Sequence, residues 1–206
     1  MRLQEIDDWR KITVGATGHR PDRMGGYSNA LGGYNRNHPI VTNLRGITLE
    51  VMEDLIANHG MTRFVSGGAL GFDSLFFWCA NHLKAKYPHI ENVLAVPFLN
   101  QWKAWGDEQV IYWYHKMVEY ADVIIDVARH PVYGTREEHV PLDDYSKTKM
   151  FKRNEYMVDQ SCYLLAFFDG SRSGTGQCIR YAQRGIINRP SIIKLDPRCA
   201  CKPEYI

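Results

Sequence analysis

Three short glycine-rich segments carry residue types that suit the binding of a phosphate group. They read GATGHRP (residues 15–21), SGGALGFD (residues 66–73) and DGSRSGTG (residues 169–176). Glycine lets the backbone approach a ligand closely, and the hydroxyl, imidazole and guanidinium groups beside the glycines can donate hydrogen bonds to an anion. Each segment also follows an apolar run typical of a β-strand. We therefore expect the three segments to form one anion-binding rim.

Most candidate ligand-binding residues lie in these three segments. Asp73 could accept hydrogen bonds from ribose hydroxyls, or it could simply stabilise the first turn of the helix that follows. The first segment could likewise be an ordinary tight turn. The candidates are Gly15, Thr17, Gly18, His19 and Arg20 in the first segment, Ser66, Gly67, Gly68, Ala69, Gly71 and Asp73 in the second, and Asp169, Gly170, Gly174 and Thr175 in the third.

Two further pairs could contact the same ligand. Gln101 and Trp102 follow a third apolar run, where an amide and an indole could hydrogen-bond and stack on a base, although core packing would also explain the tryptophan. Arg153 and Asn154 precede a later apolar run and could add charge and an amide. The alternative for the second pair is a solvated helix face, because it lies in a run of charged residues.

Several other site classes find no support in the sequence. The dinucleotide-binding spacing GxGxxG and the Walker A lysine motif are missing. The eight histidines form no HxxxH or HExxH pattern, and the five cysteines form no CxxC pair. We expect no metal site and no required cofactor, and the sequence identifies no catalytic residue.

Composition places the chain among globular proteins of the cytoplasm. The 206 residues are 45% hydrophobic, which suits one domain over residues 1–206 with a substantial core. The N-terminal segment lacks the apolar core of a signal peptide, and no apolar run is long enough to span a bilayer. The net charge of +2 gives no positive support to nucleic-acid binding. The sequence leaves the oligomeric state open.

The elements that must position the candidate residues alternate between strands and helices. Six apolar runs predict strands, and helical spacing or glycine-bounded segments between them predict five helices. This alternation predicts a Rossmann-like three-layer α/β domain with a mainly parallel sheet of about six strands. The predicted strands are 11–16, 62–66, 92–97, 122–127, 162–168 and 191–195, and the predicted helices are 40–58, 71–87, 102–120, 148–160 and 174–185. The long loop over residues 21–39 could be a lid or a partner contact.

The combination of TGHRP, SGGALGFD and DG…SGTG resembles the YpsA-like branch of the SLOG superfamily. The resemblance covers about residues 12–195. It implies a Rossmann-like fold that binds a nucleotide-derived ligand, often as a sensor. A nucleotide or an ADP-ribose-like molecule is therefore the ligand class that we expect.

Two other SLOG groups suggest different activities. Arg153 and Gly174-Thr175 of this chain would match motif positions of the LOG phosphoribohydrolases. Cys178, however, stands where the catalytic glutamate of those enzymes would be. Cleavage of an N-glycosidic bond would then need another carboxylate, such as Asp73 or Glu155. The chain is also similar to the single-strand DNA-binding protein DprA, at residues 66–73 and at Arg153-Asn154. The leading hypothesis is the sensing or sequestration of a small nucleotide-like ligand, with hydrolysis and single-strand binding as alternatives.

Overall fold

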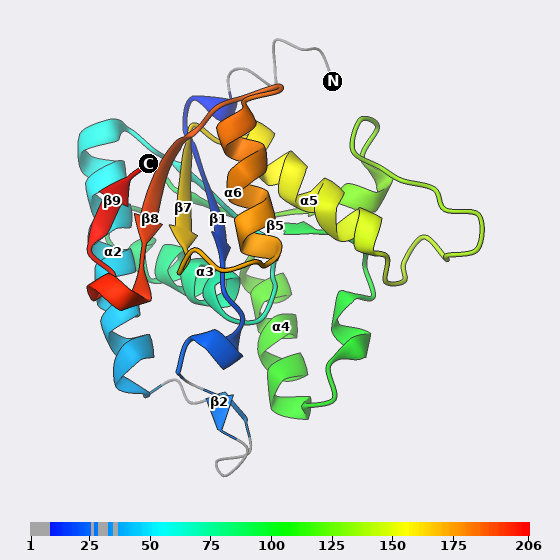
Figure 1. Ribbon diagram of the computed structural model, residues 1–206, viewed down its shortest axis with the longest axis horizontal. Coiled ribbons are helices and arrows are strands. Elements are labelled where there is room, and N and C mark those ends of the chain that lie inside the picture. The colour runs from blue at the N-terminus through cyan, green and yellow to red at the C-terminus, as the bar shows by residue number, and fades with distance from the viewer. Residues whose placement is uncertain (1–8, 26, 29–32, 35–36) are drawn as a thin grey trace.

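The computed structural model describes residues 9–25, 27–28, 33–34 and 37–206, and its centre is a seven-stranded sheet. The strand order is β6-β5-β4-β1-β7-β8-β9 (Figure 1). All neighbouring strands are parallel except β8 and β9, which pair antiparallel. The strands are β1 Thr13–Gly18, β4 Arg63–Ser66, β5 Glu91–Val96, β6 Val123–Asp126, β7 Tyr163–Phe167, β8 Ser191–Leu195 and β9 Pro203–Tyr205.

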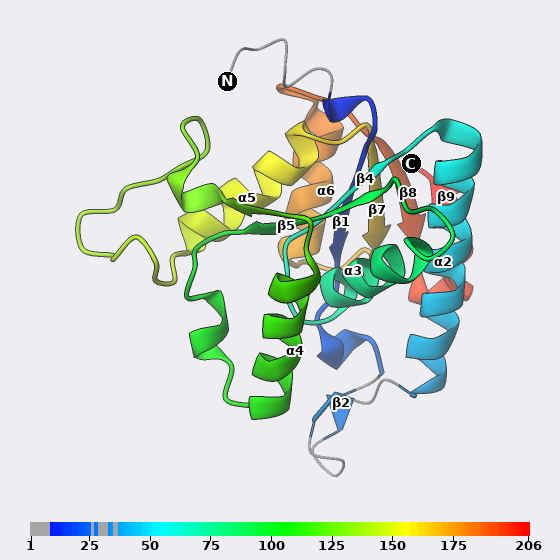
Figure 2. The ribbon, with the colours of Figure 1, turned by 180° about the vertical axis from the view of Figure 1, so that it is seen from behind.

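Helices cover both faces of the sheet. On one face lie α2 (Pro39–His59), α3 (Phe72–Leu83) and α4 (Glu108–Tyr120), which are seen in front in Figure 2. On the other face lie α5 (Lys147–Asp159) and α6 (Gly174–Arg184). The arrangement is the Rossmann-like three-layer domain that the sequence predicted.

Alternation along the strands explains why both faces must be covered. Leu165 and Phe167 of β7 belong to the core beneath α2 and α3, whereas Leu164 and Ala166 belong to the core beneath α5 and α6. All four side chains are fully buried. Unbroken apolar strands of this kind are stable only between two layers of helices.

The six predicted strands are confirmed, and three features differ from the prediction. Strand β9 was missed because it is a three-residue edge strand that begins at a proline and has no apolar periodicity. A short hairpin, β2 (Tyr27–Ser28) with β3 (Gly33–Tyr34), lies in the segment read as a loop, parts of which fall outside the described residues. Residues 101–104 form a 3-10 turn, and α4 begins only after its cap at Asp107.

The strand order reverses at β1. From β1 the strands proceed outward through β4 and β5 to β6, and the chain then crosses back to place β7 on the other side of β1. Ligands of open α/β sheets bind at such a reversal, outside the carboxyl ends of the strands. The glycine segments lie at the carboxyl ends of β1, β4 and β7, the three strands that border this reversal, and the first segment includes the last four residues of β1. None of the described helices has the length and apolar character needed to cross a bilayer.

Candidate functional site

The segment after β1 is tightly packed against the beginning of α3. A Cβ atom on Gly18 would lie 2.4 Å from the Cβ of Phe72, so this position has no room for a side chain. The amide of Phe72 donates a hydrogen bond to the carbonyl of His19 (3.1 Å). Gly71 has a φ of +97°, and a Cβ there would lie 2.4 Å from that carbonyl. The first and second glycine segments are therefore in direct contact.

His19 also joins the first segment to the third. Its ring is buried, and its Nε2 atom lies 2.8 Å from Oδ1 of Asp169 and 3.1 Å from the amide nitrogen of the same residue. The His19 amide donates to the carbonyl of Phe167 (3.2 Å). Desolvation raises the pKa of Asp169, but hydrogen bonds from Ser171 and His19 outweigh it and lower the pKa to about 2. An ionised Asp169 thus fixes the third segment against β1.

A buried ion pair supports the second segment from below. The guanidinium of Arg153, on α5, donates a hydrogen bond to the carbonyl of Gly67 and lies 3.7 Å from the carboxylate of Asp73. A Cβ on Gly67 would lie 1.5 Å from Nη1 of Arg153, so only glycine fits. Both charged side chains are more than nine-tenths buried. A buried pair is costly to break because one partner would remain as an uncompensated charge.

The carboxylate of Asp73 faces its own loop. The amides of Ala69 and Gly67 donate hydrogen bonds to this carboxylate, and these bonds help to hold the loop in its conformation. Burial raises the pKa of Asp73, and the charges of Arg153 and of Arg20 oppose that rise. These contacts give Asp73 a structural role in the loop. Its contact with a ribose stays a prediction.

The remaining residues of the second segment shape its backbone. Gly68 has a φ of +64°, which favours glycine, and its Cβ would lie 2.8 Å from a methyl group of Leu94. Gln101 is buried and donates from Nε2 to the carbonyls of Gly67 and Gly68 (3.2 and 3.1 Å). Ala69 is also buried, and the hydroxyl of Ser66 is a buried group without a partner among the described residues.

The third segment forms the start of α6. Ser173 caps the helix by accepting a hydrogen bond from the amide of Gly176 (3.2 Å), and Thr175 is buried in the first turn. Gly170 has a φ of +85°, so it turns the chain after β7. Gly174 has open space where a Cβ would be. By contrast, the first turn of α3 has no side-chain cap, since its N-cap residue is Gly71.

Three predicted residues lie away from the open rim. Gly15 is inside β1, where a Cβ would lie 2.6 Å from the Ser161 hydroxyl beneath α5. The Trp102 ring packs edge-on against His115 of α4, at 5.1 Å between centroids. Asn154 accepts a hydrogen bond from Nε of Arg153 (3.0 Å) and lines a cavity between α5 and α6. Their contact with a ligand stays a prediction.

The groups that could perform hydrolysis are not poised for it. Cys178 is buried beside Thr17, and desolvation raises the pKa of its thiol to about 11, so it is protonated near neutral pH. Glu155 lines the α5–α6 cavity and pairs with Lys152 (2.6 Å), apart from the buried carboxylate of Asp73. Among the described residues, no group of three or more His, Cys, Asp or Glu side chains is arranged to hold a metal ion.

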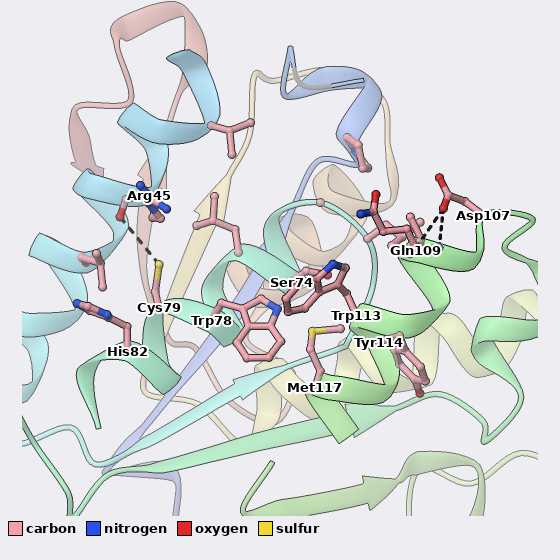
Figure 3. Close-up of a pocket in the computed structure, with 17 residues that line it drawn as sticks. Arg45, Ser74, Trp78, Cys79, His82, Asp107, Gln109, Trp113, Tyr114 and Met117 are labelled. Carbon is pink, nitrogen blue, oxygen red and sulfur yellow. Dashed lines mark hydrogen bonds between the residues drawn. The ribbon is translucent and has the colours of Figure 1, made fainter. Parts of the chain in front are cut away.

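A large cavity that the sequence did not predict lies over α3, between α2 and α4 (Figure 3). Its volume is about 660 Å³, and its walls are mostly apolar. One end reaches Leu70 and Gly71 of the second segment and Pro21 after β1. A signal for it is present in the sequence, because Ser74, Trp78 and His82 of α3 recur at helical spacing and therefore share one face of the helix.

Comparison with known proteins gives a consistent family. The chain matches the YspA SLOG family (YpsA) over residues 17–184. It is 42% identical over 147 residues to the uncharacterised SPbeta prophage-derived protein YoqJ of Bacillus subtilis, covering 71% of this chain and 84% of that protein. It is 28% identical over 151 residues to a UPF0398 protein of Halalkalibacterium halodurans, covering 72% of this chain and 71% of that one.

A solved structure shares the fold. It is DNA processing protein A of Helicobacter pylori, described for its single-stranded DNA binding mode. The TM-score is 0.50 at 16% sequence identity, and the match covers 94% of this chain and 68% of that one.

Proposed function

The chain belongs to the YpsA family of SLOG proteins, and from that premise we propose that it binds a nucleotide-derived, phosphate-bearing small ligand at the carboxyl ends of β1, β4 and β7. The proposal makes the protein a sensor or a sequestering protein for that ligand. A nucleotide or an ADP-ribose-like molecule is the expected chemical class.

The observation that carries the proposal is the joining of the three glycine segments. His19 bonds to Asp169 of the third segment through its ring, and to the amide of Phe72 in the second segment through its carbonyl. Three loops held together at the reversal of strand order form one rim, which is the position where open α/β sheets bind ligands.

The rim has the features that favour an anion. Helix α3 begins there without a side-chain cap, and the carboxylate in its first turn, that of Asp73, is paired with Arg153, so the positive end of the helix can still attract an anion. Arg20 is exposed beside it, and its charge acts on both Asp73 and Arg153. A phosphate placed over the start of α3 would be within the field of both features.

Binding without turnover is favoured over hydrolysis by the state of the candidate catalytic groups. The Cys178 thiol is a poor general acid or base because desolvation raises its pKa to about 11. The Asp73 carboxylate is held by Arg153 and by the loop amides. A hydrolase would need a free carboxylate at this rim.

The test is thermal unfolding with AMP, ADP-ribose, NAD and a short single-stranded oligonucleotide, followed by analysis of each mixture for breakdown products. A ligand at 100 times its dissociation constant adds about 2.7 kcal/mol to the unfolding free energy. We expect one of the small nucleotides to raise the melting temperature and to be recovered intact. Breakdown products would instead establish the hydrolase, and no shift with any small nucleotide would contradict the proposal.

Arg20→Ala is the variant that ties binding to the rim. Loss of one charge-assisted contact to a phosphate should weaken binding about tenfold or more, with the fold intact because Arg20 is exposed. Arg189→Ala is the matched control. Arg189 is exposed just before β8 and therefore lies at the amino ends of the strands, away from the rim. Equal affinity of the two variants would remove the rim from the site.

Single-strand DNA binding is the second candidate, because the Helicobacter pylori protein that shares the fold is described for that activity. It predicts that a labelled oligonucleotide binds at low salt and dissociates steeply as salt rises. A net charge of +2 favours the small ligand instead. An oligonucleotide that binds more tightly than every small nucleotide would reverse this preference.

A further inference from the structure

The cavity over α3 is continuous with the rim of the proposed nucleotide site. Its lining begins at Leu70 and Gly71, where the second glycine segment enters α3, and continues along that helix to His82. Eleven residues of α-helix span about 16 Å. A ligand whose phosphate lies over the start of α3 could therefore extend directly into the cavity.

The walls of the cavity suit an aromatic ring. Trp78 of α3 and Trp113 of α4 meet edge to face, with ring centroids 5.8 Å apart at 90°, and both line the cavity (Figure 3). Both indoles are only partly buried, so each has surface left for a further contact. A base that stacks on a protein aromatic ring gains on the order of 1–3 kcal/mol of binding free energy, equivalent to roughly a tenfold or larger change in affinity.

Polar groups at the rim end of the cavity could orient such a ring. Ser74, Asp107 and Gln109 line this end, and Asp107 also caps α4 by accepting from the amide of Gln109 (2.9 Å). The volume of about 660 Å³ is within the range of small-molecule sites and is larger than one base requires. Arg45 and His82 are polar residues of the lining on the α2 side, so the cavity is mostly apolar with a few polar groups, the usual form of a small-molecule site.

We infer that this cavity receives the nucleobase of the bound ligand, with Trp78 and Trp113 as its aromatic contacts. The inference rests on the proposed function, because it places the phosphate of the same ligand at the rim. It also differs from the sequence prediction, which assigned base stacking to Trp102.

The test compares AMP with ribose 5-phosphate, which has the same phosphate and sugar but no base. We expect Trp113→Ala to weaken AMP binding about tenfold and to leave ribose 5-phosphate binding unchanged. Tyr205→Ala is the matched control, because Tyr205 is an exposed aromatic residue of β9 that does not line the cavity. Gln109→Trp, which fills the mouth from an exposed position, should weaken AMP binding without removing a core side chain.

The outcomes separate this inference from the proposed function. If Arg20→Ala weakens AMP binding while Trp113→Ala and Gln109→Trp do not, the rim site stands and the base lies elsewhere. If none of AMP, ADP-ribose and NAD binds, the proposed nucleotide site and the placement of the base in the cavity both fail. If Trp113→Ala changes the molar mass measured by light scattering and leaves AMP binding unchanged, this face is an interface between copies of the chain, and the inference is overturned.

Discussion

At the scale of single residues, Gly67 is a position where a neighbouring side chain takes the place of a Cβ atom. The Arg153 guanidinium occupies the space that a Cβ atom of residue 67 would need. From there it contacts the Gly67 carbonyl and the Asp73 carboxylate. The glycine is thus required by a neighbour in the structure rather than by its own backbone conformation. A ligand could depend on Gly67 only indirectly, through the loop that Arg153 holds in place.

Gly67→Ala should therefore destabilise the protein by about 2–4 kcal/mol, because the guanidinium must move and leave the Asp73 carboxylate without its partner. Gly174→Ala is the control, since a Cβ at Gly174 meets no atom within 4 Å at the start of α6. We expect that control to change the unfolding free energy by less than about 0.5 kcal/mol or to raise it slightly. Urea unfolding measures both. Similar midpoints for the two variants would show that Arg153 does not depend on Gly67.

At the scale of elements, the site is a set of connections between strand ends. The turn after β1 is bonded to the turn after β7 through His19 and Asp169, and to α3 through the carbonyl of His19. Helix α5 reaches the turn after β4 through Arg153. Each glycine segment is consequently positioned by an element that is distant in sequence.

The connection between β1 and β7 should depend on pH. The pKa of Asp169 is lowered to about 2 in the folded protein, from its ordinary value of 3.8. A lowered pKa stabilises the fold above about pH 4, and this contribution is lost as the pH falls toward 2. Since the Asp169 side chain is 25% exposed, we expect a contribution on the order of 1 kcal/mol rather than the full value of the shift.

Asp169→Asn should remove this part of the acid dependence. Urea unfolding between pH 5 and pH 2 should give a shallower loss of stability for the variant than for the unmodified protein. Asp196 and Asp143 also have lowered pKa values, so the difference between the two curves is the informative quantity. Asp22→Asn, which changes an exposed carboxylate in the turn after β1, should reproduce the unmodified curve. Parallel curves for Asp169→Asn and the unmodified protein would exclude the ionic connection.

At the scale of the whole molecule, a ligand at the rim should order the three glycine segments together. They follow three adjacent strands and share hydrogen bonds, so a contact with one restricts the others. Amide hydrogen exchange is the suitable measurement, because it reports local opening segment by segment. We expect AMP or ADP-ribose to slow exchange over residues 18–23, 66–73 and 168–175.

The turn between α6 and β8 lies at the amino ends of the strands, away from the rim, and serves as the internal control for this experiment. Its exchange should be unchanged by the ligand. Protection of one glycine segment alone would contradict a shared rim. Protection along α3 and α4 in addition would support the placement of the base in the cavity.

The sequence by itself determined the strands of the parallel sheet, the class of fold and the ends at which the glycine segments lie. These follow from local patterns, because apolar runs of strand length and glycine turns act within a few residues. Strand β9 was missed for the same reason, since it has no such pattern. The family resemblance was also readable from the glycine motifs, and the family match confirms it.

Only the tertiary structure decided which side chains meet. Arg153 reaches Gly67 across 86 positions of the chain, and His19 reaches Asp169 across 150. The same holds for the cavity between Trp78 and Trp113, which depends on how α3 and α4 are rotated against the sheet. Local periodicity fixes the face that a helix buries, but strand order and helix packing fix its neighbours. Contacts between distant segments are therefore a property of the assembled fold.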